Sequence, residues 1–159
     1  MSNYITALQA VLADSYSLYL KTQNYHWNVD GPHFRSLHLM FEEQYNDLFA
    51  ANDEIAERIR ALGEKVDGSY DGFAKLTKIK PANKDAEAME MVKDLFQSNQ
   101  QLIATMKACL QAAQGADDEV TADMLIARIN VHEKTSWMLR SFLPQDMRAG
   151  LDAPASYAA

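Results

Sequence analysis

The sequence predicts an all-α protein, a four-helix bundle with one long crossover between its second and third helices. Four long segments carry apolar residues at three- and four-residue steps, the period of an amphipathic helix. The connections between these segments are short, long and short in that order. The 159 residues, 48% of them hydrophobic and 23% charged, suit one compact domain. We therefore expect a single domain over residues 1–159, with flexible termini at 1–3 and about 145–159.

The first two helices are expected on either side of a short turn. The first helix runs from Tyr4 to about Asn28, and the following Asp-Gly-Pro at 30–32 breaks it. The second helix runs from about His33 to Leu62, and Gly63 is a suitable C-terminal stop. Their expected buried faces hold Leu8, Val11, Leu12, Tyr16, Tyr19, Leu20 and Trp27 in the first, and Phe34, Leu37, Met40, Phe41, Tyr45, Leu48, Phe49, Ile55 and Ile59 in the second.

The long crossover covers residues 63–83, which are rich in glycine and contain Pro81, with a short helix possible over 72–78. The third helix is expected to begin at an Asn83 cap and to end near Gln114. The fourth begins after Asp117 or Asp118, ends near Phe142 before Pro144, and buries Trp137 among its apolar residues. Four helices with one long crossover form the ferritin-like arrangement.

Five side chains suited to metal binding are the most informative feature of the first two helices: His26, His38, Glu42, Asp53 and Glu57. Relative to His38, the last three lie at roughly 40°, 60° and 100° around the helix axis, so they share one face. His38 and Glu57 are nevertheless separated by about 28 Å of helix at 1.5 Å per residue. One metal ion therefore cannot bind both ends of this helix within one chain.

A two-fold dimer resolves this separation. The pair His38 and Glu57 and the pair Glu42 and Asp53 have the same midpoint, between residues 47 and 48. An antiparallel copy of the helix crossing at that point brings the first member of each pair opposite the second member in the partner, as an isologous contact requires. The spacing therefore predicts two identical metal sites per dimer, each shared between the two subunits.

The ligand types leave several metals open. Imidazole with carboxylate suits Fe(II), Mn(II) or Zn(II), and the single Cys109, expected in the core, excludes a thiolate cluster. The pair His38 and Glu42 and the pair Asp53 and Glu57 are each ordinary on a solvated helix surface when taken alone. Only their shared midpoint distinguishes them from such surface pairs. Zinc remains a competitor, so a zinc-binding scaffold without redox turnover is an alternative. His33 and His132 fall outside the pairing; we expect the first to be exposed or capping and the second to lie at a surface or interface.

The same residues carry a family resemblance. The stretch Lys21-x4-His26-Trp27-Asn28-Val29-x-Gly31-x2-Phe34-x2-Leu37-His38-x3-Glu42, followed by Asp53-Glu54-x-Ala56-Glu57-Arg58, resembles the Dps family of mini-ferritins. The resemblance implies a hollow dodecamer of tetrahedral symmetry with a ferric mineral inside. It also implies ferroxidase centres at two-fold interfaces, where His26, His38 and Glu42 come from one subunit and Asp53 and Glu57 from its mate.

The resemblance carries further expectations about the chemistry. Members of the family oxidise Fe(II) with hydrogen peroxide in preference to oxygen, which protects against oxidative stress. Glu42 stands where the family's commoner residue is Asp, so the metal spacing or affinity is expected to differ. Trp27 follows the first expected ligand, His26, in the sequence. We expect its indole either to supply or trap an electron during iron oxidation or simply to fill volume in the core. Asp118, Glu119 and Asp123 are candidates for an acidic three-fold pore that guides Fe(II) inward, although helix capping alone explains one or two of them.

The charge of the chain argues against DNA as the main partner. The formal net charge is −7, the sequence pI is about 5.0, no basic residue precedes Lys21 and none follows Arg148. A dodecamer multiplies this charge, which opposes approach to a polyanion. The function favoured is therefore iron oxidation and storage, and the alternative is a DNA-condensing nucleoid protein with secondary ferroxidase activity. The first residues lack the pattern of a signal peptide and no apolar run suits a membrane span, so we expect a cytoplasmic protein.

Overall fold

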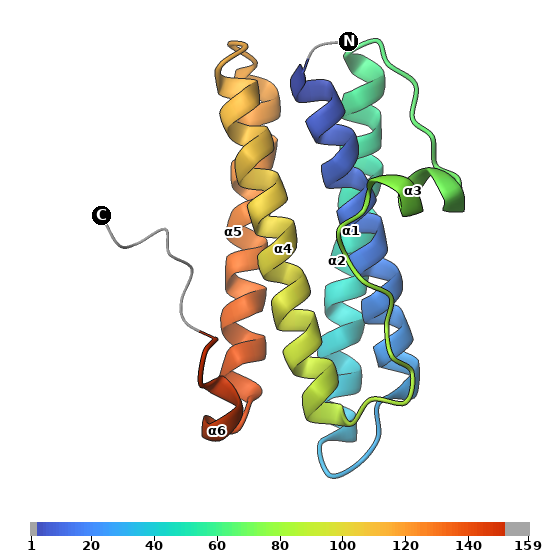
Figure 1. The fold of residues 1–159 in the computed structure, drawn as a ribbon, viewed down its shortest axis with the longest axis vertical. Helices are drawn as coiled ribbons and strands as arrows, with labels where there is room; N and C mark the ends of the chain where they lie inside the picture. Colours follow the sequence, from blue (N-terminus) through green and yellow to red (C-terminus); the bar gives the residue numbers. More distant parts are fainter. Residues whose placement is uncertain (1–2, 152–159) are drawn as a thin grey trace.

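The structure, a computed structural model that describes residues 3–151, is helical throughout its regular elements (Figure 1). The helices are α1 (Asn3–Asn28), α2 (Phe34–Ala61), α3 (Tyr70–Leu76), α4 (Ala88–Gln114), α5 (Glu119–Phe142) and α6 (Gln145–Arg148). α1, α2, α4 and α5 form the bundle, and α3 lies in the long crossover beside α1. The predicted all-α bundle with a short helix in its crossover is confirmed.

The crossover exists because α2 and α4 run in the same direction along the bundle (Figure 1). The chain must return along the full length of the molecule between them, and a buried carboxylate, Asp14 of α1, holds it in place. Asp14 accepts hydrogen bonds from the Thr77 hydroxyl at 2.9 Å, the Lys78 amide at 2.6 Å and the Thr105 hydroxyl of α4 at 2.7 Å. One side chain thereby ties the crossover to two bundle helices.

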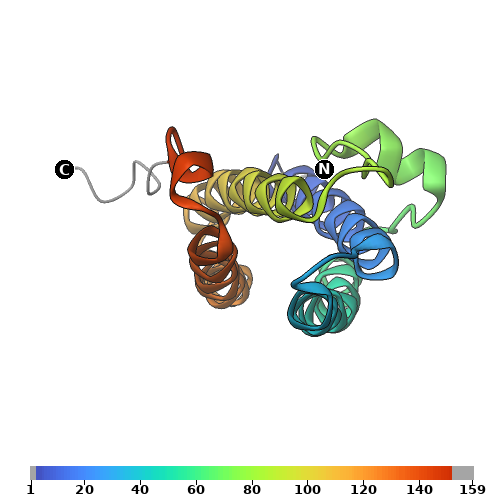
Figure 2. The same cartoon turned by 90° about the horizontal axis from the view of Figure 1, so that it is seen from below.

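The core lies between α1 and its neighbours α2 and α4, and between α4 and α5. Seen along the bundle, α1 and α4 lie side by side in the middle while α2 and α5 flank them (Figure 2). α2 and α5 make the fewest contacts of the bundle neighbours, so the bundle is most open between them. The largest fully buried apolar side chains are Leu8, Leu18, Leu37, Phe41, Ile55, Ile59, Met91, Leu95, Leu102, Met106 and Leu125. Each contributes about 1.5–3 kcal/mol by leaving water.

Two of the three predicted helix ends are formed as expected, and the predicted start of the third helix is wrong. Gly63 adopts φ 94°, and the amides of Gly63 and Glu64 donate to the carbonyls of Arg60 and Ile59, which closes α2 in a Schellman motif. The Asp118 cap of α5 is confirmed, because its carboxylate accepts from the Thr121 amide at 3.0 Å. The prediction that Asn83 caps the third helix is wrong. Its side chain accepts from the Asp85 amide in a turn, and α4 begins at Ala88.

Several aromatic residues predicted to be buried are exposed on the subunit. The exposed fractions are 66% for Trp27, 67% for Phe49 and 65% for Trp137, and Leu20 and Phe34 are also exposed. Helical periodicity finds an apolar face, but it does not distinguish a bundle core from a surface that another subunit covers. The prediction that these residues are buried in the core of a single chain is therefore wrong.

The ordered C-terminal part extends further than expected. We placed the start of a flexible terminus near residue 145, but residues 145–148 form α6, and Arg140 Nε donates to the Leu151 carbonyl at 2.8 Å. The remaining parts of the expected flexible termini, 1–2 and 152–159, lie outside the described residues. Within residues 3–151, no helix is long and apolar enough to cross a membrane.

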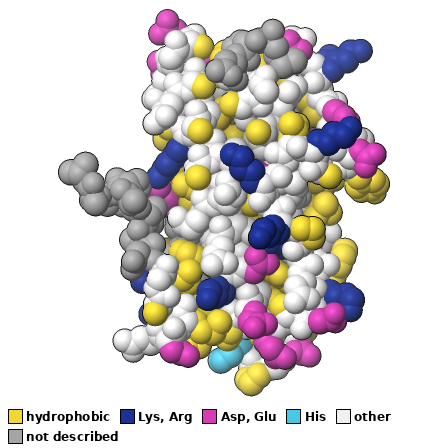
Figure 3. Space-filling model, in the orientation of Figure 1, with side chains coloured by type: hydrophobic (Ala, Val, Ile, Leu, Met, Phe, Trp, Pro, Cys, Tyr) yellow, Lys and Arg dark blue, Asp and Glu magenta, His cyan; other side chains and the backbone are white. Residues whose placement is uncertain are grey.

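The surface is charged without a continuous basic patch on the face shown in Figure 3. Lys and Arg side chains are scattered over this face, and acidic side chains gather toward its lower end, where α4 begins.

Candidate metal centre

His26 and His38 lie beside each other because the turn between α1 and α2 is short. α1 ends at Asn28, Gly31 adopts φ 95° in the turn, and α2 begins at Phe34. Val29 is 3% exposed and anchors the turn against the core. The last turn of α1 therefore faces the first turns of α2, and the two imidazole rings stack with centroids 3.8 Å apart and planes 20° apart.

Each of these histidines is oriented by the backbone of the other. His26 Nδ1 lies 2.8 Å from the His38 carbonyl oxygen, and His38 Nδ1 lies 2.8 Å from the His26 carbonyl oxygen. A carbonyl can only accept, so both Nδ1 atoms carry hydrogen and donate. In a neutral ring this leaves Nε2 with a free lone pair, which is the arrangement found in metal-binding histidines. The local fold thus prepares two imidazole ligands.

The stacking also limits how the two rings can bind metal. An imidazole lone pair lies in the plane of its ring, and these two planes are nearly parallel with centroids 3.8 Å apart. A metal–nitrogen bond is about 2.0–2.1 Å long for zinc, and other divalent ions require similar alignment. One ion cannot lie in both planes, so this geometry suits two ions, one for each histidine.

The carboxylates predicted as ligands are divided along α2. Glu42 lies one helical turn from His38 and is half-buried, whereas Asp53 and Glu57 are exposed and lie farther along the helix. Within the described part of the chain, no group of three or more His, Cys, Asp or Glu side chains is close enough to hold a metal ion. The structure brings together the two histidines and leaves Asp53 and Glu57 elsewhere. That each centre is shared between two subunits stays a prediction from the spacing.

The two helices that carry the histidines and carboxylates also carry exposed apolar side chains, and the Phe34 ring lies 5.0 Å from the His38 ring between centroids. Leu20 and Trp27 of α1 and Phe34 and Phe49 of α2 are between 45% and 67% exposed. Phe49 is next to the midpoint of the ligand pairs on α2. Such an apolar face on one side of a helix pair is typical of a surface that another protein covers. Trp27 fills no core volume within its own subunit, so the packing alternative holds only if a partner covers it.

Tyr45 is a neighbour of the site that the sequence reasoning missed. Its ring meets the His26 ring edge-on with centroids 5.1 Å apart, and it also contacts Tyr19. Tyr45 lies on the same face of α2 as His38 and Glu42, but we assigned it to the apolar face because aromatic periodicity carries no sign of ligand contact. Tyr45 therefore packs against the ring of His26, a predicted ligand.

The acidic residues at the start of α5 differ from one another. Partial burial tends to raise the pKa of Asp118, but hydrogen bonds from the Thr121 hydroxyl and amide and from Arg58 prevail and lower it to about 2. Arg58 Nη2 lies 2.7 Å from the Asp118 carboxylate, so that charge is already neutralised within the subunit. Glu119 and Asp123 are exposed, and a pore lined by these acidic residues stays a prediction.

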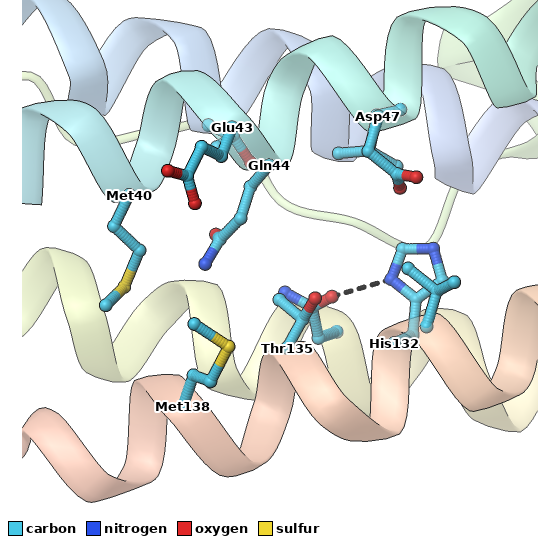
Figure 4. A pocket seen from close by; sticks show the side chains of 11 residues that line it. Met40, Glu43, Gln44, Asp47, His132, Thr135 and Met138 are labelled. Carbon is cyan, nitrogen blue, oxygen red and sulfur yellow. Dashed lines mark hydrogen bonds between the residues drawn. The ribbon is translucent and has the colours of Figure 1, made fainter.

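His132 of α5 lies in a second polar region, beside the side of α2 that faces the bundle interior, and not at a surface or interface as we expected. It is 2% exposed and hydrogen-bonds Asn99 of α4 and Arg128 of its own helix, and Arg128 in turn pairs with the exposed Asp47 of α2. The expectation was wrong because Asn99, which lies far away in the sequence, packs against the ring. The network adjoins a pocket of about 200 Å³ between α2 and α5, into which Glu43, Gln44, Thr135 and Met138 also point (Figure 4).

Comparisons with known proteins agree with this fold. The family model of the ferritin-like domain matches residues 5–149. DNA protection during starvation protein 2 of Bacillus anthracis is 37% identical over 141 residues, covering 89% of this chain and 97% of that protein. A low-temperature-induced protein of Nostoc is 43% identical over 141 residues, covering 87% of this chain and 79% of that protein.

Solved structures give the same result. Dps from Staphylococcus aureus superposes with a TM-score of 0.87 at 33% identity, covering 91% of this chain and 97% of that one. Dps from Vibrio cholerae, described as a member of a broad superfamily of ferritin-like diiron-carboxylate proteins, superposes with a TM-score of 0.85 at 33% identity and covers 89% of each chain. The family and the fold are therefore shared, and the five residues predicted as ligands lie within the matched residues.

Proposed function

The chain belongs to the Dps family of ferritin-like proteins, and from this premise we propose that it is a ferroxidase which oxidises Fe(II) and stores the ferric product. The centres are shared across a two-fold dimer: His26, His38 and Glu42 of one subunit face Asp53 and Glu57 of its mate. The single observation that supports this most strongly is the pair of stacked histidines, whose Nδ1 atoms are both occupied by backbone carbonyls.

The proposed reaction follows from these ligands. Neutral imidazole binds Fe(II), and hard carboxylates favour the Fe(III) product. Two Fe(II) ions each give one electron, and hydrogen peroxide takes both electrons and two protons, so that its O–O bond breaks and two water molecules form. Delivering both electrons at one paired site avoids the one-electron step that releases hydroxyl radical. Trp27 is adjacent to the centre, and we propose that its indole gives an electron to any oxidising radical that escapes from it.

The proposed assembly is a homo-oligomer built from two-fold dimers, most simply a dodecamer that encloses the mineral in the cytoplasm. The exposed apolar face of α1 and α2 supplies the dimer contact, because an isologous interface places Phe49 of both subunits near the dyad. Glu119 and Asp123 are proposed to line the iron path, and Asp118 contributes less since Arg58 neutralises it. Zinc competes for the same nitrogen and oxygen ligands.

The experiment that tests the ferroxidase adds Fe(II) without oxygen, then hydrogen peroxide, and follows ferric absorbance. Replacing Asp53 and Glu57 together by Ala is expected to abolish rapid oxidation. Glu54→Ala is the matched control, because Glu54 is an exposed carboxylate between the two proposed ligands but outside the set. No ferric signal in the unaltered protein would leave a zinc-binding scaffold as the function.

A mixing experiment tests the sharing of each centre. One variant carries His26→Ala with His38→Ala, and the other carries Asp53→Ala with Glu57→Ala, so neither oxidises iron alone. In a mixed dimer one centre receives both damaged halves and the other receives both intact halves. Random reassembly of equal amounts is expected to restore about a quarter of the sites. No recovery in verified mixed dimers would show that the centre is not shared in this way.

DNA condensation remains the second candidate only through the names of relatives, such as the DNA protection during starvation protein of Bacillus anthracis. The formal net charge of −7 and the dispersed Lys and Arg side chains on the face in Figure 3 favour the iron function. At moderate ionic strength, the assembled protein is expected to leave the mobility of linear DNA unchanged in a gel. Retention of the DNA under those conditions would support the nucleoid function instead.

A further inference from the structure

The His26 ring is held in place by His38 and by Tyr45, a residue outside the proposed ligand set. His26 Nδ1 donates to the His38 carbonyl oxygen at 2.8 Å, and the two imidazole rings stack with centroids 3.8 Å apart. The Tyr45 ring meets the His26 ring from another direction, with planes 73° apart and centroids 5.1 Å apart. Edge-on contacts at this separation are favourable between aromatic rings. Tyr45 therefore limits the orientations open to the His26 ring.

Tyr45 is itself fixed by a row of aromatic rings between α1 and α2. It lies on α2, about two helical turns after His38, and is half-buried. Its ring meets that of Tyr19 of α1 edge-on, with centroids 6.1 Å apart. The Tyr19 ring packs against the core and also contacts the Tyr16 ring, with centroids 5.6 Å apart. In such close packing, each ring fills the space that its neighbour needs in order to turn.

The His38 ring has a different kind of neighbour. Phe34 lies beside it, with centroids 5.0 Å apart and planes 31° apart. Phe34 is 45% exposed on the subunit, and an exposed side chain changes rotamer readily. A ring that can move away gives less support than the half-buried Tyr45. The two histidines are therefore supported unequally, and Tyr45 accounts for the stronger support of His26.

We propose that Tyr45 is a positioning residue, which fixes the His26 ring so that its Nε2 lone pair keeps one direction. A ring that is free to turn about its side-chain bonds directs Nε2 elsewhere for part of the time, and the metal affinity falls in proportion. Removing a group that orients a metal ligand typically lowers the affinity roughly 10- to 100-fold, and a ring contact belongs at the lower end of this range. This inference rests on the proposed function, because it treats His26 as a ligand.

The test compares Tyr45→Ala, which removes the ring, with Tyr45→Phe, which keeps the ring and loses the hydroxyl. Tyr16→Ala is the matched control, because the ring contacts of Tyr16 are with Tyr19 and Phe73. Co²⁺ binding to the assembled protein is followed by visible absorbance, for the ion whose binding is lost in His26→Ala. Tyr45→Ala is expected to bind this ion about 10-fold more weakly. The other two variants are expected to bind it within about twofold of the unaltered protein.

Unchanged affinity in Tyr45→Ala, or an equal loss in Tyr45→Phe or Tyr16→Ala, would overturn the proposal. A second measurement uses crystals of the metal-free Tyr45→Phe and Tyr45→Ala proteins. We expect one position of the His26 ring in Tyr45→Phe and more than one in Tyr45→Ala, with the fold unchanged. A single ordered position in Tyr45→Ala would also overturn the proposal. If His26→Ala binds Co²⁺ as the unaltered protein does, His26 is not a ligand and the proposed ferroxidase centre is wrong, whatever the position of the ring.

Discussion

The two opposite faces of α2 carry or meet similar side chains, but these side chains differ in whether a cation is paired with them. We call the face with His38 the outer face and the face with Asp47 the inner face. On the outer face, His38 has a free Nε2 and lies near the exposed Phe49, Asp53 and Glu57. On the inner face, Asp47 is paired with Arg128, which also hydrogen-bonds the buried His132. Both faces combine imidazole with carboxylate, but only the inner one contains its own cation. Folding of the chain therefore leaves the His38 Nε2 atom without a cation on one face and pairs the Asp47 carboxylate with a cation on the other.

Truncating a buried and an exposed phenylalanine of α2 should give the largest contrast. Phe41 is fully buried and Phe49 is 67% exposed on the isolated subunit. We expect Phe41→Ala to lower the free energy of unfolding by about 3–5 kcal/mol, because it leaves a cavity. Phe49→Ala should change the stability of a monomeric subunit by less than about 0.5 kcal/mol but weaken dimerisation. Chemical denaturation and analytical ultracentrifugation measure the two effects, and a stable dimer of Phe49→Ala would contradict the interface.

Metal-linked stabilisation should separate His26 and His38 from His132. Zn²⁺ at about 100 times its dissociation constant is expected to stabilise the assembled protein by about 2.7 kcal/mol per site. Replacing His26 and His38 together by Ala should lose this increment, whereas His132→Ala should keep it while lowering the stability of the metal-free protein, since Arg128 and Asn99 lose a partner. Thermal melts with and without Zn²⁺ distinguish the two. A metal-dependent shift that survives without both His26 and His38 would remove these ligands from the set.

The inner face should also show a pH dependence of its own. Burial first, and then the nearby positive charge of Arg128, lower the pKa of His132 from 6.5 to about 3. The unfolded chain therefore binds a proton that the folded one does not between these values, so stability is full above pH 6.5 and falls as the pH is lowered. We expect His132 to account for a loss of about 2 kcal/mol between pH 7 and pH 5. Denaturation of the unaltered protein and of His132→Gln at both values measures this, and equal losses would contradict it.

The helix spans were predictable from the sequence because apolar periodicity is local. The spacing of His38, Glu42, Asp53 and Glu57 along one helix is local too, and their role as ligands around a shared midpoint stays a prediction. The inner network was not predictable, because Arg128 and Asp47 are 81 residues apart and nothing local pairs them. The start of α4 was missed for the opposite reason: a turn stabilised by the Asn83 side chain competes with helix capping. Exposure of Trp27 and Trp137 required the packed subunit.

The start of α5 offers the smallest expected change in stability and the sharpest test of the pore. Asp118 is tied to Arg58 and Thr121, whereas Asp123 is exposed. Asp118→Asn should lower the free energy of unfolding by about 1 kcal/mol through the cap and the ion pair. Asp123→Asn should leave stability within about 0.5 kcal/mol. It should nevertheless slow iron uptake without changing the number of Fe(II) ions bound at the ferroxidase centre, because only the path is altered. Stopped-flow oxidation and anaerobic Fe(II) titration measure the two quantities, and normal uptake by Asp123→Asn would move the iron path elsewhere on the shell.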